Sequence, residues 1–267
     1  MLKNSHFSLL DKFRGVTIPK QRSSQLAEFL GIMLGDGNLT DKRKGRKTTN
    51  QITISGSSLE DVDYHHNYLQ KVFKNLFSIQ FKESHIRKNE SRLRIYSKAI
   101  FYFLSLQGLQ QGSKSTAEHI PLVIFSSNNK LKRSFLRGVF DTDGCLKFAA
   151  KDKSRLHKYP IIKIGLENKN YIRDIAILLN TLGFKFYIVY NEKARDQRSK
   201  KVYLKHVIYI SGKLQLEKWM LEINSKNEKH LSKWKIWEKH GFCPPKTTLL
   251  QRKAILKGIL DPLSFYD

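Results

Sequence analysis

Residues 29–37 read Phe-Leu-Gly-Ile-Met-Leu-Gly-Asp-Gly, and residues 136–144 repeat this pattern without a gap as Leu-Arg-Gly-Val-Phe-Asp-Thr-Asp-Gly. The apolar positions agree in kind, and three positions are identical, namely Gly31/Gly138, Asp36/Asp143 and Gly37/Gly144. The two copies lie 107 residues apart. A repeat of this length indicates that the chain is built from two related halves.

Each copy is predicted to be a helix with one face of small residues. Gly31 and Gly35 stand four positions apart and share that face, as do Gly138 and Thr142 in the second copy. Glycine inside a helix costs about 1 kcal/mol relative to alanine, so two glycines on one face need a compensating contact. We expect the two helices to pack against each other along these faces.

The acidic ends of the two helices form the predicted metal site. Asp36 and Asp143 fall in the last turns, and Gly37 and Gly144 are expected to end the helices in the left-handed conformation. A carboxylate is unfavourable at the negative end of a helix dipole, and two adjacent carboxylates repel each other. A divalent cation removes both penalties. Mg²⁺ (or Mn²⁺) suits carboxylate oxygens and keeps positions open for phosphate and water, whereas Ca²⁺ is expected to bind without supporting a reaction. The predicted metal residues are Asp36, Asp143, Gly35 and Thr142.

The charge balance indicates a polyanionic partner. The 267 residues include 49 Lys and Arg against 23 Asp and Glu, a net charge of +26. Nucleic acid is the leading partner, because phosphate neutralisation supplies much of the affinity of basic proteins. An anionic membrane surface is the other reading, although the sequence has no apolar run of the ~18 residues that a spanning helix needs. No secretory signal is recognised, so an intracellular location is expected, in the cytoplasm of a prokaryote such as an archaeon or in an organelle.

Hydrophobic periodicity predicts the same order of elements in both halves: helix, two strands, helix, two strands, helix. This is an α+β fold. The expected elements after the first motif are 51–55, 59–77, 81–88, 91–98 and 99–109, and after the second 145–149, 160–168, 169–182, 185–191, 202–211 and 214–223. The predicted boundaries are an N-terminal extension at 1–23, subdomains at 24–112 and 131–243, a linker at 113–130, and a basic C-terminal tail at 244–267 with a helix at 248–260.

The paired motif resembles that of single-chain, archaeal-type LAGLIDADG homing endonucleases, and the resemblance covers roughly residues 24–245. It implies two pseudo-symmetric αββαββα subdomains, helices packed at their interface, and two antiparallel sheets that form a saddle on DNA. In that family the carboxylate before the last glycine binds the metal, which is Asp36 here in one half and Asp143 in the other. The earlier acidic position, usually structural, is Leu34 in the first copy and Asp141 in the second.

The resemblance also implies a lysine near the attacking water in each half. The contexts Gly112-Ser113-Lys114-Ser115 and Asn224-Ser225-Lys226-Asn227 suggest Lys114 and Lys226, with Lys229 as a competitor for the second. A polar residue after the second strand supports the water in such enzymes. Asn168 fits this place in the second half, and in the first half the match falls on Gly56-Ser57 and stays open.

Alternation along the strands predicts sheets with one buried and one polar face. Basic, amide and aromatic residues on the polar face reach phosphates and base edges. The candidate DNA-binding residues are Gln51, Thr53, Ser55, Arg92, Arg94, Tyr96, Lys147, Lys163, Lys185, Tyr187, Tyr203 and Lys205.

The leading hypothesis is therefore a monomeric, site-specific, metal-dependent endonuclease that cuts both strands of a long, partly asymmetric duplex DNA site and is encoded by an intron. An intein context is less favoured, because the sequence has neither Cys nor Ser at its start nor a His-Asn pair at its end. The alternative is a non-cleaving nucleic-acid binder of the same fold, either an RNA-splicing maturase or a transcription regulator. A third reading is a basic structural protein on membranes or other polyanions.

Overall fold

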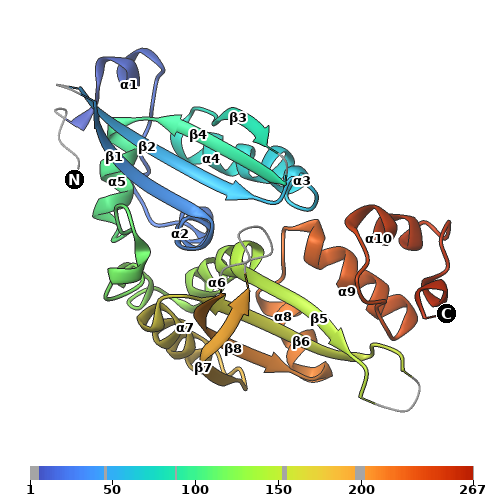
Figure 1. Cartoon of the computed structure of the whole chain (residues 1–267). Helices are drawn as coiled ribbons and strands as arrows, with labels where there is room; N and C mark the ends of the chain where they lie inside the picture. The colour runs from blue at the N-terminus through green and yellow to red at the C-terminus, as the bar shows by residue number, and fades with distance from the viewer. Residues whose placement is uncertain (1–5, 45–46, 88, 152–154, 196–201, 267) are drawn as a thin grey trace.

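The computed structural model describes residues 6–44, 47–87, 89–151, 155–195 and 202–266, and each of its halves carries a four-stranded antiparallel sheet (Figure 1). The elements of the first half are α2 (Ser24–Gly35), β1 (Gly37–Lys44), β2 (Lys47–Gly56), α3 (Val62–Tyr64), the π-helix η2 (His65–Leu69), α4 (Gln70–Phe77), β3 (Lys82–Arg87), β4 (Glu90–Tyr96) and α5 (Lys98–Leu106). Those of the second half are α6 (Asn129–Asp143), β5 (Gly144–Ala149), β6 (Tyr159–Leu166), α7 (Lys169–Thr181), β7 (Tyr187–Arg195), β8 (Val202–Ser211) and α8 (Lys213–Glu222). The sheets have the equivalent orders β1-β2-β4-β3 and β5-β6-β8-β7, so the predicted αββαββα repeat is confirmed.

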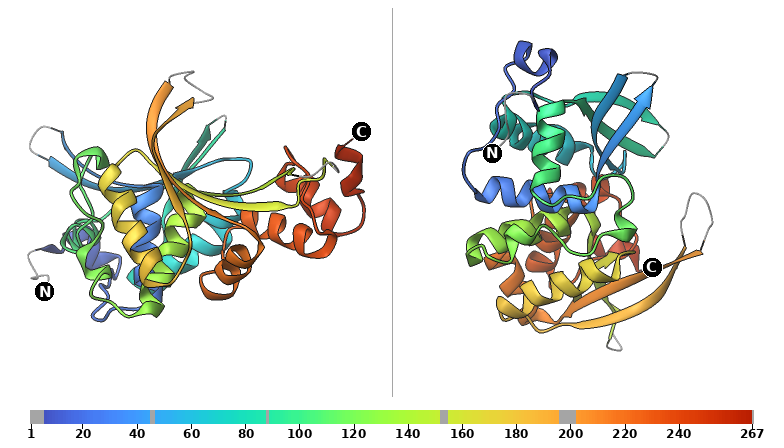
Figure 2. Two further views of the ribbon diagram at one scale, coloured as in Figure 1. Left: turned by 90° about the horizontal axis from the view of Figure 1, so that it is seen from below. Right: turned by 90° about the vertical axis from the view of Figure 1, so that its left-hand side faces the viewer.

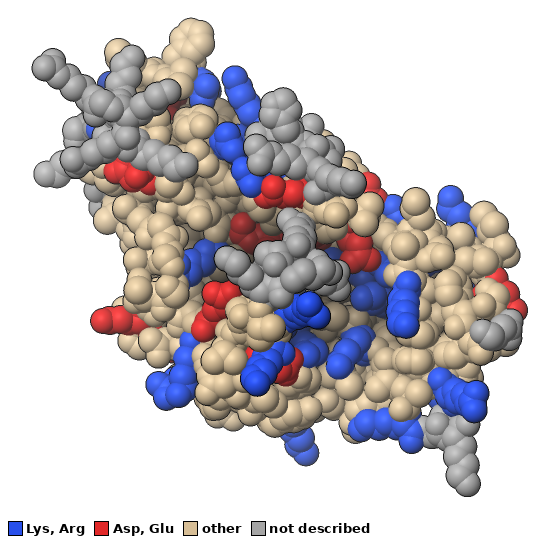
Figure 3. Space-filling view, viewed as in Figure 1, with Lys and Arg blue, Asp and Glu red and all other residues tan. Residues whose placement is uncertain are grey.

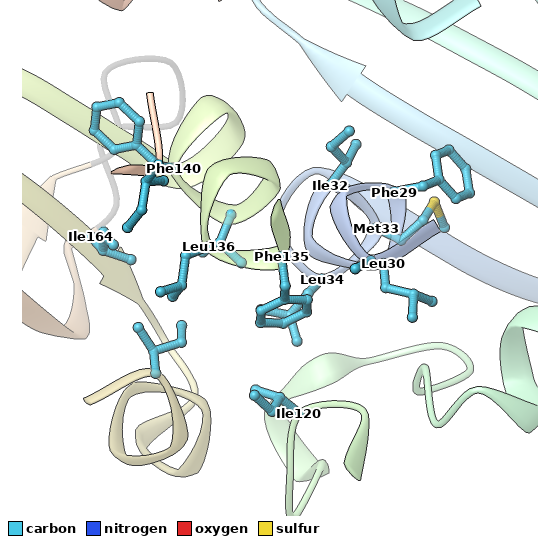
Figure 4. Close-up of a cluster of buried hydrophobic side chains, with 14 of the residues drawn as sticks. Phe29, Leu30, Ile32, Met33, Leu34, Ile120, Phe135, Leu136, Phe140 and Ile164 are labelled. Carbon is cyan, nitrogen blue, oxygen red and sulfur yellow. The ribbon is translucent and has the colours of Figure 1, made fainter. Parts of the chain in front are cut away.

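Helices α2 and α6 form the interface between the halves, and the two sheets open away from them on one side (Figure 2, right). Their glycines are required by the close approach. A Cβ on Gly31 would lie 2.1 Å from the carbonyl oxygen of Phe135, and a Cβ on Gly138 would lie 2.1 Å from that of Glu28. The predicted contact along the small-residue faces is therefore present. Beside it, Leu34 and Phe135 are buried next to each other, with Ile120 facing them (Figure 4).

The prediction that Gly37 and Gly144 end the helices in the left-handed conformation is wrong. Neither glycine has positive φ; Gly144 is extended, with φ −83° and ψ 162°, and both glycines start strands. They are required for space instead. A Cβ on Gly37 would lie 2.6 Å from the carbonyl oxygen of Met33, and one on Gly144 would lie 2.3 Å from that of Phe140. At each glycine the chain therefore passes from helix into strand with its backbone packed against the last turn of that helix.

Three further differences from the predicted elements have local causes. Strand β1 was not among the predicted strands, because its sequence is polar and lacks an apolar alternation. The helix expected at 59–77 starts later and passes through a π-helical turn, η2, before α4. The helix expected at 248–260 is α10 (Leu249–Leu256), which starts at a Thr248 capping box and stops just before Gly258, where φ is +75°.

The remaining described elements lie at the ends of the chain and between the halves. They are α1 (Leu9–Phe13), the 3₁₀ turns η3 (Lys114–Thr116) and η4 (Leu122–Ile124), α9 (Glu228–His240), and the 3₁₀ turn η5 (Pro262–Phe265). Helix α10 packs on α9 at the far end of the second half (Figure 1). Within the described ranges, every helix is too short or too polar to cross a bilayer.

Candidate active site

The two motif carboxylates meet where α2 and α6 end together. Asp36 is the C-terminal cap of α2, and Asp143 is the last residue of α6. A Cβ on Gly35 would lie 2.8 Å from Oδ2 of Asp143, so the side chain of one motif reaches the helix end of the other. Ser55 of β2 donates its amide to the carbonyl oxygen of Asp36 at 3.2 Å, which ties this end to the sheet. The predicted pairing of Asp36 with Asp143 is thus present in the structure.

The electrostatics of this pair favour a bound cation. Burial and the neighbouring Asp143 raise the pKa of Asp36 from 3.8 to about 8, although Lys229 opposes the shift. Burial likewise raises the pKa of Asp143, against the charges of Lys114, Lys229 and Lys205. Two adjacent buried carboxyls resist ionisation, because each anion is poorly solvated and repels the other. A bound divalent ion would stabilise both as anions.

The pair lines a cleft of about 670 Å³ to which both halves contribute. Its walls include Asn38 and Ser55 from the first half and Glu167, Tyr203 and Lys205 from the second. A larger cavity of about 860 Å³ lies between the segment 19–22 and the linker residues 116–123, and it has none of the predicted site residues in its walls. The chemistry-bearing side chains therefore gather in the smaller, polar cleft.

Lys114 lies at this cleft as predicted. Its Nζ donates to the carbonyl oxygen of Leu34 at 2.8 Å and also to that of Gly35. Burial lowers the pKa of Lys114, while Asp143 and Asp36 act in the opposite direction. The ammonium therefore sits on the last carbonyls of α2, at the negative end of that helix.

In the second half, Lys229, the competitor of Lys226, has its ammonium on the end of α6, whereas Lys226 is exposed. Asp141 accepts bonds from the Ser225 hydroxyl and, at 2.8 Å, from the Lys226 amide, and the side chain of Lys226 is exposed. Asn227 then caps α9, whose first turn directs Lys229 back to α6. Nζ of Lys229 donates to the carbonyl oxygen of Thr142 at 3.2 Å, the counterpart of the Lys114 contact with Gly35.

Asn168 lines the same cleft, and its side-chain amide holds the segment that carries Lys114. It caps α7, and its Nδ2 donates to the carbonyl oxygens of Lys114 at 2.7 Å and Ala117 at 2.9 Å. The equivalent residue of the first half, which the sequence left open at Gly56-Ser57, is Asp61, the cap residue of α3. Aligning the residues before the two equivalent helices is the signal that would have found it.

The predicted DNA-binding residues share the polar faces of the two sheets. In the first sheet they pair directly across β2 and β4, as Gln51 with Tyr96, Thr53 with Arg94 and Ser55 with Arg92. In the second sheet Lys163 pairs with Tyr209, which pairs with Tyr187. Lys147, Tyr203 and Lys205 lie on the same sheet, whereas Lys185 lies two residues before β7, outside the sheet. Lys and Arg side chains are spread over the second half in this view, with acidic side chains toward the middle (Figure 3).

A carboxylate, Glu192, also lies on the second sheet, and the sequence did not identify it. Nζ of Lys163 donates to the carboxylate of Glu192 at 3.1 Å. The hydroxyl of Tyr209 donates to the same carboxylate. The Tyr187 and Tyr209 rings stack at 4.9 Å between centroids. A bulge between Val189 and Glu192 shifts the register of β7 and brings Glu192 opposite Lys205.

The donor set fits a hard divalent ion that retains open positions. Among the described residues, no group of three or more His, Cys, Asp or Glu side chains is arranged to hold a metal. Asp36 and Asp143 therefore supply two carboxylates only, which leaves positions for water and phosphate, as Mg²⁺ sites commonly do. The carbonyl oxygens of Gly35 and Thr142 already accept bonds from Lys114 and Lys229.

A family model matches the second half of the chain, which contains the second motif copy. Residues 130–224 match the model of the LAGLIDADG-like domain. Among curated proteins, glutamine–fructose-6-phosphate aminotransferase of Methanocaldococcus jannaschii is 28% identical over 171 residues, 63% of this chain and 14% of that protein. The replication factor C small subunit of the same organism is 28% identical over 254 residues, 92% of this chain and 13% of that protein. The chain thus spans about a seventh of the length of these relatives.

Solved structures share the fold over most of the chain. I-DmoI in complex with DNA and Mn superposes with a TM-score of 0.51 and 21% identity, covering 75% of this chain and 96% of that chain. The meganuclease I-SmaMI bound to uncleavable DNA superposes with a TM-score of 0.53 and 12% identity, covering 82% of this chain and 91% of that chain. The fold is therefore that of the two-motif LAGLIDADG homing endonucleases, as the resemblance of the sequence implied.

Proposed function

We propose that this chain is a divalent-metal-dependent endonuclease that acts as a monomer, cuts both strands of a long duplex DNA site, and serves the mobility of an intron. The observation that supports it most is the meeting of Asp36 and Asp143 at the joined ends of α2 and α6, inside a polar cleft that also holds Lys114 and Lys205. If the two carboxylates were ordinary solvated helix ends, α2 and α6 would not need to approach so closely that only glycine fits at Gly31 and Gly138.

In this proposal Asp36 and Asp143 hold the metal, and a metal bound there activates water and stabilises the leaving oxygen of a phosphodiester. Lys114 and Lys229 place two ammonium groups on either side of the pair, each fixed on a helix-end carbonyl. Such groups orient water and offset the charge that develops on phosphate. The equivalence of the two lysines matches a reaction carried out twice, once per strand.

The polar sheet faces bring the DNA to this point. Both sheets open on the same side of α2 and α6 (Figure 2, right), so one duplex lying across them would pass over the carboxylates. The net charge of +26 supplies the phosphate attraction that such binding needs. Two proteins of the same fold were solved on DNA, one of them with Mn, which supports the same partner and cofactor class for this chain.

The decisive experiment selects bound duplexes from a randomised DNA library and then tests the selected sites in plasmids with Mg²⁺ or with EDTA. We expect linear product with Mg²⁺ only, and none from Asp36→Asn or Asp143→Asn, although both variants keep binding. Glu222→Gln, which removes a carboxylate of α8 outside the cleft, should cut like the wild type. Selection of a tight site that the wild type never cuts contradicts the enzyme and favours the non-cleaving alternative.

A further inference from the structure

Asp61 is a buried carboxylate beside the cleft, only 5% exposed. Its Oδ1 accepts the Asn227 side-chain amide at 2.8 Å and lies 3.1 Å from Nζ of Lys229. Its Oδ2 accepts the Ser57 amide at 2.8 Å. A Cβ on Gly56 would lie 3.0 Å from the same carboxylate, so the side chain is confined on several sides.

The two lysines are consequently held by different chemistry. Lys229 is shared between the Thr142 carbonyl and the Asp61 carboxylate. Lys114 donates to main-chain carbonyls of α2, and its segment is fixed by the neutral amide of Asn168, the cap residue equivalent to Asp61. Asn168 thus donates to the segment of Lys114, whereas Asp61 accepts from Lys229. Of the two lysines, only Lys229 gains an anionic partner from the residue that precedes the equivalent helix.

The segment that carries Asp61 is itself fixed from outside the motif halves. Arg252 of α10 is 1% exposed, and its Nη2 donates to Oε1 of Glu60 at 2.6 Å while its Nε donates to Ser232 at 2.9 Å. Lys253 of the same helix donates to Asp63. Helix α10 therefore binds Glu60 and Asp63, which lie on either side of Asp61 in the sequence. This helix lies outside the span 130–224 that matches the family model.

We infer that Asp61 is a positioning residue that serves Lys229 alone, and that helix α10 holds Asp61 in place through Arg252 and Glu60. The inference rests on the endonuclease proposed above and adds to it a difference between its two cuts. Each cut relies on its own lysine, so loss of Asp61 should impair one strand and spare the other.

The test uses full-length protein and a supercoiled plasmid that carries a library-selected site. In Asp61→Asn, conversion to nicked circles should proceed near the wild-type rate, while conversion of nicked circles to linear DNA falls roughly tenfold or more, as loss of a charged hydrogen bond predicts. Arg252→Gln and Glu60→Gln should show a weaker form of the same strand bias. Equal slowing of both steps, or no slowing, overturns the inference, because a general loss of folded protein does not distinguish the strands.

A second measurement does not require cleavage. In protein labelled with ¹⁵N-lysine, the ammonium resonance of Lys229, assigned with Lys229→Met, should shift or vanish by exchange in Asp61→Asn and in Glu60→Gln. The resonance of Lys114 should stay in place, and Glu222→Gln should alter neither. An unchanged Lys229 resonance overturns the positioning role even if the wild type cuts DNA. A shifted one supports it even if no cleavage is found, in which case the proposed function alone fails.

Discussion

Replacing Asp36 with Asn should stabilise the metal-free protein, and the gain should grow with pH. Asp36 has a pKa of about 8 in the folded protein against an ordinary value of 3.8. The folded state therefore binds more protons than the unfolded chain between about pH 4 and pH 8, and its stability falls as pH rises through that window. Each tenfold change in the acid constant changes the free energy of unfolding by about 1.4 kcal/mol. The stabilisation expected from Asp36→Asn therefore has an upper limit of roughly 6 kcal/mol at pH 8. Because residue Asp36 as a whole is only half-buried, solvent screens part of its charge, and we expect a gain of about 2–3 kcal/mol at pH 8 and almost none at pH 4.

The assay is urea unfolding followed by tryptophan fluorescence in EDTA, at several pH values between 4 and 8, for the wild type and Asp36→Asn. Adding Mg²⁺ at pH 8 should stabilise the wild type and narrow its difference from the variant, because the ion binds only the folded pair. Asp141→Asn is the matched control. It removes a carboxyl whose pKa burial raises to about 7 but which holds the 225–227 segment instead of the metal, so its Mg²⁺ response should persist. A difference between Asp36→Asn and the wild type that does not widen with pH would refute this account of the pair.

Three further predictions concern the interface, the lysines and the DNA surface. Gly138→Ala should lower the free energy of unfolding by about 2 kcal/mol or more, because its Cβ would meet backbone at 2.1 Å; Gly165→Ala, whose Cβ would have its nearest neighbours at 3.4 Å, is the matched glycine control in the same urea assay. Lys229→Met should slow plasmid linearisation, whereas Lys226→Met should cut at close to the wild-type rate; the reverse order would restore the sequence-based choice. Arg94→Ala should weaken binding to the selected site and reduce the slope of log affinity against log salt by about 1 in a filter-binding titration; an unchanged slope would remove this residue from the phosphate contacts.

The helix interface could be predicted because its cause is local. Gly31 and Gly138 stand at matching places in a repeat, and an unfavourable residue type on a helix face indicates a close neighbour. The conformation of Gly37 and Gly144 could not be predicted in the same way. A glycine after a helix fits both a left-handed cap and a tight exit into a strand, and only the position of the following strand decides between them.

The choice between Lys226 and Lys229 depended on a contact that the sequence does not display. Asp141 fixes the Ser225–Asn227 segment from another helix, and this contact turns Lys226 outward. The first half has Leu34 at that motif position, so the lysine segments of the two halves differ in what holds them. A match by local sequence context assumes the same support in both halves. The role of Asp61 was hidden for a related reason, because its partners Asn227 and Lys229 lie more than 160 residues away along the chain.

The caps reach across the interface, and this limits how the two halves can be recombined. Asn168 of the second half binds the segment of Lys114, and Asp61 of the first half binds Asn227 and Lys229. A chimera that joins either half to a foreign partner separates both pairs at once, even when each donor half is intact. A redesign that exchanges halves therefore has to transfer residues 61 and 227 together, and residues 168 and 114 together. Helix α10 has to be transferred with the first pair.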